Sequence, residues 1–543
     1  MSGTERAWLL GALIALVALF ARRAAGTRAD HAGRWGWSVA ATGVAAMLLT
    51  TWIWDGLRSP AVINDEAAYL LQAELLAGGA WSAASPGPID AFVQPAVLIT
   101  PVLAPKMPPG HALLMVPGVW MNLPGLVPVL LTGATAALLM LLAREVAGSG
   151  AGMLSVALWL SQAGQMRWRA SYFSEMTTGC LWLLGWWALL RWRRSAHFGW
   201  LGVLAFATGL GAITRPLTML AWVLPVAVVI LYDIGRTGRW AQLLGGIVIG
   251  STMLSVMPIQ NYAVLGDWRA SPLALYTRQY MPFDVVGFGA HSEQPELRLP
   301  AKVQAEVRIF ESRHASHTVA RLPAILAERA RAGWHQVAFG WRIALLPALL
   351  WGIVFAGVLL RFALGTVALT YAAYLVYAHE PAWTVYYLET TPVLAVTVAA
   401  GLIALLTRAI GKPVTANVGV ACAACVMLIA APDFVGTRAN VARSQAPLNT
   451  FTRVATSASG ASGALVFVPD DSAGSPSLTF VRNVAAPDPS AIITAYLRDD
   501  CTTATIAARY AGRTVLQWDE ITARMRHITP PSLATCPSAS LQR

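Results

Sequence analysis

The 543-residue sequence has little charge and little cysteine. Only 12% of its residues are Asp, Glu, Lys or Arg, and 56% are hydrophobic. A soluble globular protein has about twice that charged fraction. The balance excludes both an ordinary soluble enzyme and an intrinsically disordered chain. The hydrophobic residues cluster in blocks long enough to cross a bilayer, which takes about 20 residues of helix. The sequence therefore predicts a polytopic α-helical membrane protein.

About twelve membrane-spanning helices are expected, or eleven if the first does not cross. The first hydrophobic block, of roughly 15 residues, makes only about 22 Å of helix. Arg22 and Arg23 follow this block, whereas a cleavable signal peptide carries its positive charge before it, so an uncleaved anchor is favoured. The expected spans are 7–21, 36–54, 124–143, 149–165, 174–190, 199–213, 217–232, 240–260, 336–360, 362–378, 384–407 and 414–431.

Basic residues outnumber acidic residues by 39 to 27, which gives a net charge of +12. In a soluble protein this excess would suggest a nucleic-acid partner. Here the basic residues of the short connections concentrate in alternate loops, such as 22–34 and 191–194, which the positive-inside rule places in the cytoplasm. We therefore expect no nucleic-acid partner. Loops 55–123 and 261–335 and the tail 432–543 are expected on the periplasmic side of a bacterial inner membrane.

Two domains are expected from this arrangement. Residues 1–431 would form the transmembrane domain, including both periplasmic loops and their juxtamembrane helices. Residues 432–543 have a different composition and predict a small periplasmic α/β domain. Within this domain, the pattern predicts strands at 464–469 and 514–518, a helical turn or two at 490–498, and a strand or helix at 503–510.

The five cysteines carry little information. Cys501 and Cys536 both lie in the tail, where an oxidising compartment permits a disulfide. Whether they are bridged stays open at the level of sequence.

Two adjacent carboxylates, Asp65 and Glu66, follow the second expected span and open a helix-like run. Asn64 or Asp65 can cap that helix, and acidic residues suit its first turn. Capping explains one acidic residue but not two at a membrane surface, where loss of hydration raises a carboxyl pKa and prepares a base. Asp65 and Glu66 are therefore candidate catalytic residues, with helix capping as the alternative.

A proline-containing segment, Lys106-Met107-Pro108-Pro109-Gly110-His111, precedes an apolar helix. Its prolines prevent an earlier helix start and make the segment rigid and extended. Lys106 is one of only two Lys or Arg residues in the first outer loop. A cation here either meets the phosphate of a lipid or neutralises a phosphate leaving group. The residues alone leave both interpretations open.

Three further charged residues, Glu175, Arg215 and Glu389, lie within or at the ends of expected spans. Ionisable residues at membrane depth are energetically costly and by default indicate function. An ion pair between Glu175 and Arg215 would be a structural alternative.

The second outer loop combines aromatic and basic residues. Tyr276, Arg278 and Tyr280 can clasp a sugar and a phosphate, and an interfacial aromatic belt explains the tyrosines equally well. Residues 301–335 carry five arginines among apolar residues. This pattern fits an interfacial helix that contacts anionic lipids, or a solvated helix packed on the outer domain.

Together these segments resemble the GT-C superfamily of polyprenyl-phosphate-sugar-dependent glycosyltransferases. Within it, the protein O-mannosyltransferase and lipid A aminoarabinose transferase group is the most similar. Each motif is short, but together they occur in the family's order. They are Asp65-Glu66-x-x-Tyr69, Lys106-x-Pro108-Pro109-Gly110-His111, Ser174-Glu175-Met176, Thr214-Arg215-Pro216, Tyr276-x-x-x-Tyr280 and Tyr387-Leu388-Glu389-x-x-Pro392.

The resemblance implies that Asp65 is the general base and that Lys106 contacts the lipid-linked phosphate. Ala67 and Ala68 stand where the aminoarabinose transferases have Arg, so the sugar and the acceptor stay open. We expect Glu66 beside the base, and Arg215 and Arg278 to help hold the departing phosphate. The substrate is expected to be lined by Tyr69, His111, Glu175, Tyr276, Tyr280 and Glu389.

The expected function is that of an inverting glycosyltransferase. It would move a sugar from a polyprenyl-phosphate-linked donor to a hydroxyl of an envelope lipid, glycan or protein, in contact with membrane lipids. A divalent cation is neither required nor excluded as a cofactor. The alternatives are a polytopic transporter or lipid flippase, and a non-catalytic envelope protein. Transporters commonly contain repeats, whereas the Asp65-Glu66 segment has no counterpart after residue 270.

Overall fold

The structure is a computed structural model of the chain and describes residues 2–23, 35–289, 293–338, 340–460, 463–471, 478–533 and 536. The basic loop at 24–34, with Arg28 and Arg34, lies outside these residues. The chain divides into two compact units. Unit 1 consists of Met1–Leu57, Leu126–Ser255 and Ala320–Val441, and unit 2 consists of Arg58–Gly125, Val256–Val319 and Ala442–Arg543. Most of both outer loops therefore groups with the C-terminal tail.

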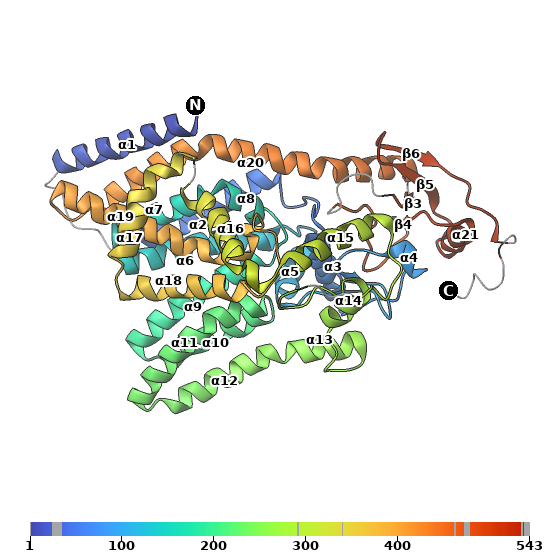
Figure 1. Ribbon diagram of the computed structural model, residues 1–543, viewed down its shortest axis with the longest axis horizontal. Coiled ribbons are helices and arrows are strands. Elements are labelled where there is room, and N and C mark those ends of the chain that lie inside the picture. The colour runs from blue at the N-terminus through green and yellow to red at the C-terminus, as the bar shows by residue number, and fades with distance from the viewer. Residues whose placement is uncertain are drawn as a thin grey trace. The chain divides into compact units, whose positions relative to one another are not determined.

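Unit 1 is a bundle of helices, in which α10 packs against both α9 and α12, and α19 packs against α7 and α17 (Figure 1). Its elements are α1 (Gly3–Arg23), α2 (Trp35–Trp54), α6 (Leu126–Ala147), α7 (Ser149–Leu160), α8 (Ala163–Arg169), α9 (Glu175–Ser195), α10 (Phe198–Ala212), α11 (Pro216–Thr237), α12 (Trp240–Leu254), α16 (Leu322–Ala338), η3 (Gly340–Leu345), α17 (Leu346–Val354), α18 (Val358–Tyr374), η4 (Thr384–Thr390) and α19 (Thr391–Ile410). The long helix α20 (Ala416–Ser459) begins in unit 1 and ends in unit 2.

Among the described residues, seven helices are long and apolar enough to cross a membrane. The bent pair Val319–His335 and Gly340–Val354 would add an eighth. Three of the predicted spans form shorter helices, since α7, α10 and α18 have 12, 15 and 17 residues. The chain is thus a multi-pass membrane protein with seven or eight candidate spans, and the predicted count of about twelve is not confirmed. The seven are Gly3–Arg22, Gly36–Trp54, Leu126–Ala147, Pro216–Thr237, Trp240–Leu265, Thr384–Ile410 and Ala416–Ser459.

Unit 2 is built on a four-stranded sheet formed by the C-terminal residues, in the order β4-β3-β5-β6. β3 (Ala464–Val468) pairs in parallel with β4 (Ile492–Tyr496) and with β5 (Thr514–Asp519). β6 (Arg524–His527) pairs antiparallel with β5. The predicted strands at 464–469 and 514–518 are therefore present, and the tail contains the small α/β region expected from its sequence.

The helical turns predicted at 490–498 are wrong, because this segment forms β4. Ile492, Ile493 and Thr494 are β-branched and suit a strand, where they pair with Ala464 to Val466 of β3. Alternate residues of β4 are buried in different hydrophobic clusters, as the period of a strand requires. The local sequence of this short segment predicts helical turns, whereas its pairing with β3 makes it a strand.

Helix α21 (Asp500–Arg509) covers the segment that the sequence left as a strand or helix. Asp499 caps it, since its side chain accepts hydrogen bonds from the backbone N–H groups of Cys501 and Thr502. Cys501 is joined to Cys536 by a disulfide. The structure thereby decides the question that the sequence left open.

Segments of both outer loops cover the two faces of this sheet. On one face, Val466 and Trp518 share a cluster with Tyr276, Tyr280 and Val303. On the other face lies a cluster that contains residues of the first loop. The outer-loop elements that contribute residues to these two clusters are α3 (Asn64–Ala77), α4 (Ile89–Phe92), β1 (Val97–Leu98), α14 (Pro272–Tyr280) and α15 (Ala301–Ser316). The outer loops also contain β2 (Ala104–Pro105), α5 (Gly110–Trp120), α13 (Val256–Leu265) and η2 (Val319–Arg321), and the residues of η2 are divided between the two units.

The basic segment 301–335 is divided between two helices, because α15 ends at Ser316 and α16 begins at Leu322. Val303 and Val307 of α15 are buried in the cluster of unit 2. For α15, this packing fits the helix packed on the outer domain that the sequence allowed.

Candidate functional site

The two adjacent carboxylates at the start of α3 lie in different surroundings. Glu66 is only 4% exposed, and its Oε2 accepts hydrogen bonds of 2.9 Å from the backbone N–H groups of Val62 and Ile63. Those groups precede the helix, so Glu66 satisfies donors at its N-terminus. Asp65 is half-buried. The prediction that Asn64 or Asp65 caps this helix is wrong, because α3 begins at Asn64 with Ile63 as its N-cap residue, and the capping contacts come from Glu66.

Arg482, from the C-terminal segment, holds the chain just before α3. Its guanidinium donates hydrogen bonds to the carbonyl oxygens of Ala61 and Val62. Burial lowers the pKa of Arg482 to about 10, and the negative charge of Glu66 opposes that effect. Arg482 thus binds backbone carbonyl groups of the 61–63 segment, and Glu66 binds its backbone N–H groups. Together they fix the start of α3.

Asn64 links α3 to two other segments of unit 2. Its Nδ2 donates to Oε2 of Glu306 over 3.0 Å, and its Oδ1 accepts from the hydroxyl of Thr479 over 3.1 Å. Asn64 is only 3% exposed. The residue next to Asp65 is therefore held from both sides.

Lys106 lies directly after β2, with its Nζ 4.4 Å from the centre of the Tyr276 ring. Among the described residues, Lys106 forms no ion pair with a carboxylate. The next residue, Met107, is held by two side-chain amides. Its carbonyl accepts hydrogen bonds from Gln72 and Gln260 over 2.9 and 3.1 Å. A cation above an aromatic face is stabilised without being neutralised.

The Tyr276 and Tyr280 rings stack with their centres 4.4 Å apart. Both side chains are at most 1% exposed, and the Tyr276 hydroxyl accepts a 2.9 Å hydrogen bond from the backbone N–H of Ala96. Burial raises the pKa of both phenols above the ordinary value. Tyr276 is thus a buried support for Lys106.

Glu306 was missed by the sequence analysis. Burial raises its pKa to about 8, and the charge of Asp65 adds to the rise, while Lys106 and the hydrogen bond from Asn64 oppose it. Asp65 and Lys106 therefore both act on one carboxyl group. No local signal marks Glu306, because it lies 242 residues from Asn64 in the sequence.

The other predicted residues of unit 2 take different positions. Tyr69 and His111 are buried and meet edge to face with ring centres 5.0 Å apart. Arg278 lies on the surface and pairs with Glu296 over 2.9 Å. Their predicted roles in lining the substrate and binding phosphate stay predictions.

Glu175, Arg215 and Glu389 come together in unit 1. Arg215 lies 2.5 Å from Glu175 Oε1 and 3.1 Å from Glu389 Oε1, and it donates to the hydroxyl of Tyr374 over 2.7 Å. Glu389 is completely buried. The pair of Glu175 with Arg215 is the structural alternative considered from sequence, and Glu389 extends it to a triad.

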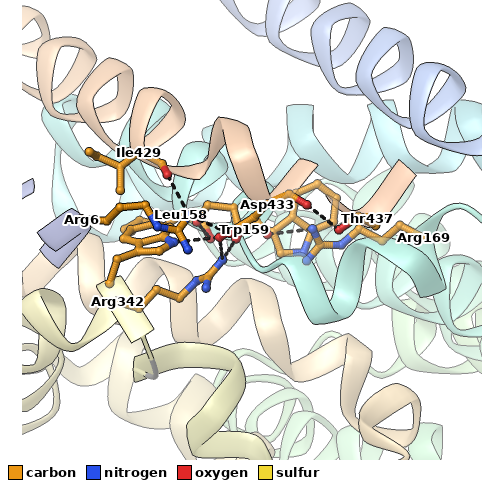
Figure 2. Close-up of polar contacts among 10 residues, drawn as sticks. Arg6, Leu158, Trp159, Arg169, Arg342, Ile429, Asp433 and Thr437 are labelled. Carbon is orange, nitrogen blue, oxygen red and sulfur yellow. Dashed lines mark hydrogen bonds and ion pairs between the residues drawn. The ribbon is translucent and has the colours of Figure 1, made fainter. Parts of the chain in front are cut away.

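A second ionic group of unit 1 surrounds Asp433 on α20. Figure 2 shows Arg6 and Arg342 converging on this carboxylate, at 2.7 and 3.5 Å. The indole N–H of Trp341 also donates to it over 2.8 Å. Asp433 thereby joins α1 and η3 to α20.

Comparison with known proteins gave matches among solved structures only. A scan against protein-family models found no match, and a search against curated proteins found none. Two similar structures are ArnT from Cupriavidus metallidurans, one bound to undecaprenyl phosphate and one in the apo state. They have 15% and 14% identity and TM-scores of 0.48 and 0.43, and each match covers 80% of this chain, with 83% and 82% of ArnT.

A third similar structure is the archaeal oligosaccharyltransferase AglB from Archaeoglobus fulgidus, in complex with an inhibitory peptide and a dolichol-phosphate. It has 12% identity and a TM-score of 0.31, over 76% of this chain and 56% of AglB. ArnT and AglB are GT-C membrane glycosyltransferases, the superfamily that the sequence motifs resemble. With TM-scores below 0.5, this likeness carries no conclusion about the chemistry of this chain.

Within the described part of the chain, no group of three or more His, Cys, Asp and Glu side chains is placed to hold a metal ion.

Proposed function

We propose that the protein is a membrane glycosyltransferase that uses a polyprenyl-phosphate-linked sugar donor. The observation that carries the proposal is that two separate segments meet at Glu306: Asn64, the neighbour of Asp65, donates a 3.0 Å hydrogen bond to it, and the charges of Asp65 and Lys106 both act on its carboxyl group. Lys106 also faces an aromatic ring, and among the described residues it forms no direct ion pair, although its charge lowers the pKa of Glu306. A carboxylate and an available cation in one neighbourhood provide a base and a phosphate ligand.

In this proposal, Asp65 removes the proton from the acceptor hydroxyl as the hydroxyl attacks the anomeric carbon of the donor sugar. The bond from that carbon to the phosphate oxygen breaks, and the configuration of the carbon inverts. Lys106 stabilises the negative charge that the departing polyprenyl phosphate carries. The backbone contacts of Glu66 and Arg482 hold Asp65 in place.

The finer assignments belong to the same proposal. The acceptor is a hydroxyl of an envelope lipid, glycan or protein, and the site faces the periplasm of a bacterial inner membrane. The charge pattern of the short loops supports that orientation. Arg215 and Arg278 are further candidates for the phosphate, although each already pairs with glutamate.

The test is to compare the envelope glycans and glycolipids of a deletion strain after complementation, by mass spectrometry. Wild-type protein should restore a glycan that the deletion strain lacks, and Asp65→Asn should not, because an amide cannot accept the proton. Glu74→Gln, on the same helix α3, is the matched control and should restore it. Levels of each variant in the membrane fraction show that it inserts.

Full restoration by Asp65→Asn would sink the proposal. Restoration of lipid transport without any change in glycan composition would instead favour the flippase alternative.

A further inference from the structure

Glu306 is oriented into unit 2 by the packing of its own helix. Val303 and Val307 of α15 are 0% and 4% exposed and lie in the cluster that contains Tyr276 and Tyr280. Residues three or four positions apart on a helix share a face, so Glu306 follows Val303 toward the interior. The hydrogen bond from Asn64 agrees with this direction.

The orientation of Asn64 fixes which group meets Glu306. The side-chain oxygen of Asn64 accepts the hydroxyl of Thr479, which leaves its NH₂ group for Glu306. An amide side chain has its acceptor at the oxygen and its donors at the nitrogen. Because the hydroxyl of Thr479 occupies the oxygen of Asn64, the nitrogen of Asn64 is the atom that donates to Glu306.

Charged and titratable groups on four separate segments interact electrostatically with Glu306. Asp65 comes from α3, Lys106 from the segment after β2, Tyr276 from α14 and Tyr496 from β4. Burial, the largest effect, and Asp65 together outweigh Lys106 and Asn64 and bring the pKa of Glu306 to about 8. The carboxyl is therefore mostly neutral at pH 7 and ionises as the pH rises through 8.

We propose that Glu306 is a third ionisable residue of the Asp65–Lys106 site, and that an anionic lipid phosphate binds there only while Glu306 is uncharged. This inference rests on the proposed function. The negative charge of Glu66 is opposed by the positive charge of Arg482. The remaining charges, of Asp65 and Lys106, are opposite in sign, so the site is close to neutral while Glu306 is uncharged. Ionised Glu306 adds a negative charge that repels the phosphate.

The experiment measures the Kd of undecaprenyl phosphate, as a probe, for the full-length protein in detergent at about pH 7 and about pH 9. In wild type, the neutral fraction of Glu306 falls about tenfold over this interval, so the Kd should rise by about the same factor. Glu306→Gln has a side chain of nearly the same shape as neutral Glu306 and cannot ionise. Its Kd should therefore change with pH only through ionisation of the probe, which affects wild type equally. Glu311→Gln, on the same helix, should follow wild type.

Asp65→Asn gives an independent test that does not need a variant of Glu306. Removing the negative neighbour should shift the midpoint of the pH dependence to lower pH, because ionised Glu306 is then repelled less. This shift is measurable even if Glu306→Gln does not fold.

Each outcome supports or overturns the inference. A parallel pH dependence in wild type and Glu306→Gln, or an unmoved midpoint in Asp65→Asn, overturns the role of Glu306 and leaves the proposed function intact. No binding by wild type at either pH overturns the proposed donor, and the role of Glu306 with it.

Discussion

The charged residues of unit 1 and those around Asp65 in unit 2 are held in opposite ways. In unit 1, Arg215 pairs with Glu175 and Glu389. In unit 2, Lys106 faces the Tyr276 ring and forms no direct ion pair among the described residues, although its charge lowers the pKa of Glu306. A buried charge in an ion pair is consistent with a structural role. A cation without a direct ion pair is consistent with a role in binding an anionic substrate.

The largest effect should come from breaking the triad of unit 1. Arg215→Met leaves Glu175 and Glu389 buried without their cation, which should lower the free energy of unfolding by about 3–5 kcal/mol. The triple variant with Glu175→Gln and Glu389→Gln should recover most of this loss. Thermal unfolding in detergent measures both. If Arg215→Met unfolds like wild type but no longer binds undecaprenyl phosphate, then Arg215 belongs to the phosphate site, as the sequence predicts.

The next effect concerns Lys106 and should be on binding rather than stability. Lys106→Gln removes a charged donor to the phosphate, worth about 1.5–3 kcal/mol, so the Kd of undecaprenyl phosphate should rise between about ten- and a hundredfold. The melting temperature should stay near that of wild type, because no ion pair is broken. Lys412→Gln, at an exposed position, should change neither quantity. A large loss of stability in Lys106→Gln alone would place Lys106 with the structural charges.

The disulfide offers a test confined to unit 2. Replacing Cys501 and Cys536 by serine opens a loop with a sequence separation of 35. The change should destabilise unit 2 by about 3 kcal/mol and leave unit 1 unaffected. Thermal unfolding followed by limited proteolysis, with cleavage sites mapped by mass spectrometry, locates the affected unit. Equal protection of the tail in both proteins would contradict the expectation.

The smallest effect is expected at Arg278. Its pair with Glu296 is exposed, so Arg278→Gln should change the free energy of unfolding by less than about 1 kcal/mol. If Arg278 keeps its pair with Glu296, the Kd of undecaprenyl phosphate should stay within about twofold of wild type. A rise of tenfold or more would show that Arg278 leaves Glu296 to bind the phosphate.

The membrane class and several parts of the tail could be predicted from local sequence. Composition and hydrophobic blocks indicate a multi-pass protein, and the runs at 464–469 and 514–518 indicate strands. The number of spans was harder to predict from sequence. The helices α7, α10 and α18 are apolar, but they are shorter than the candidate spans. The strand at 492–496 depends on pairing with β3, which a local pattern does not contain.

The candidate site was only partly predictable, for the same reason. Asp65 and Lys106 stand out because isolated charges at the edges of apolar segments are unusual. The separate role of Glu66 required the backbone contacts to Val62 and Ile63. Glu306 and Arg482 gain their meaning from residues hundreds of positions away, and a single sequence does not report such contacts.

The hold of Arg482 on Ala61 and Val62 has a consequence for how the protein is made. During synthesis, the segment around Asp65 emerges long before residue 482, and its backbone carbonyls then have no guanidinium to bind. These two hydrogen bonds can form only after residue 482 of the 543 has been translated. A chain that stops before Arg482 would lack both hydrogen bonds, so we expect the backbone just before α3 to be held less firmly in it.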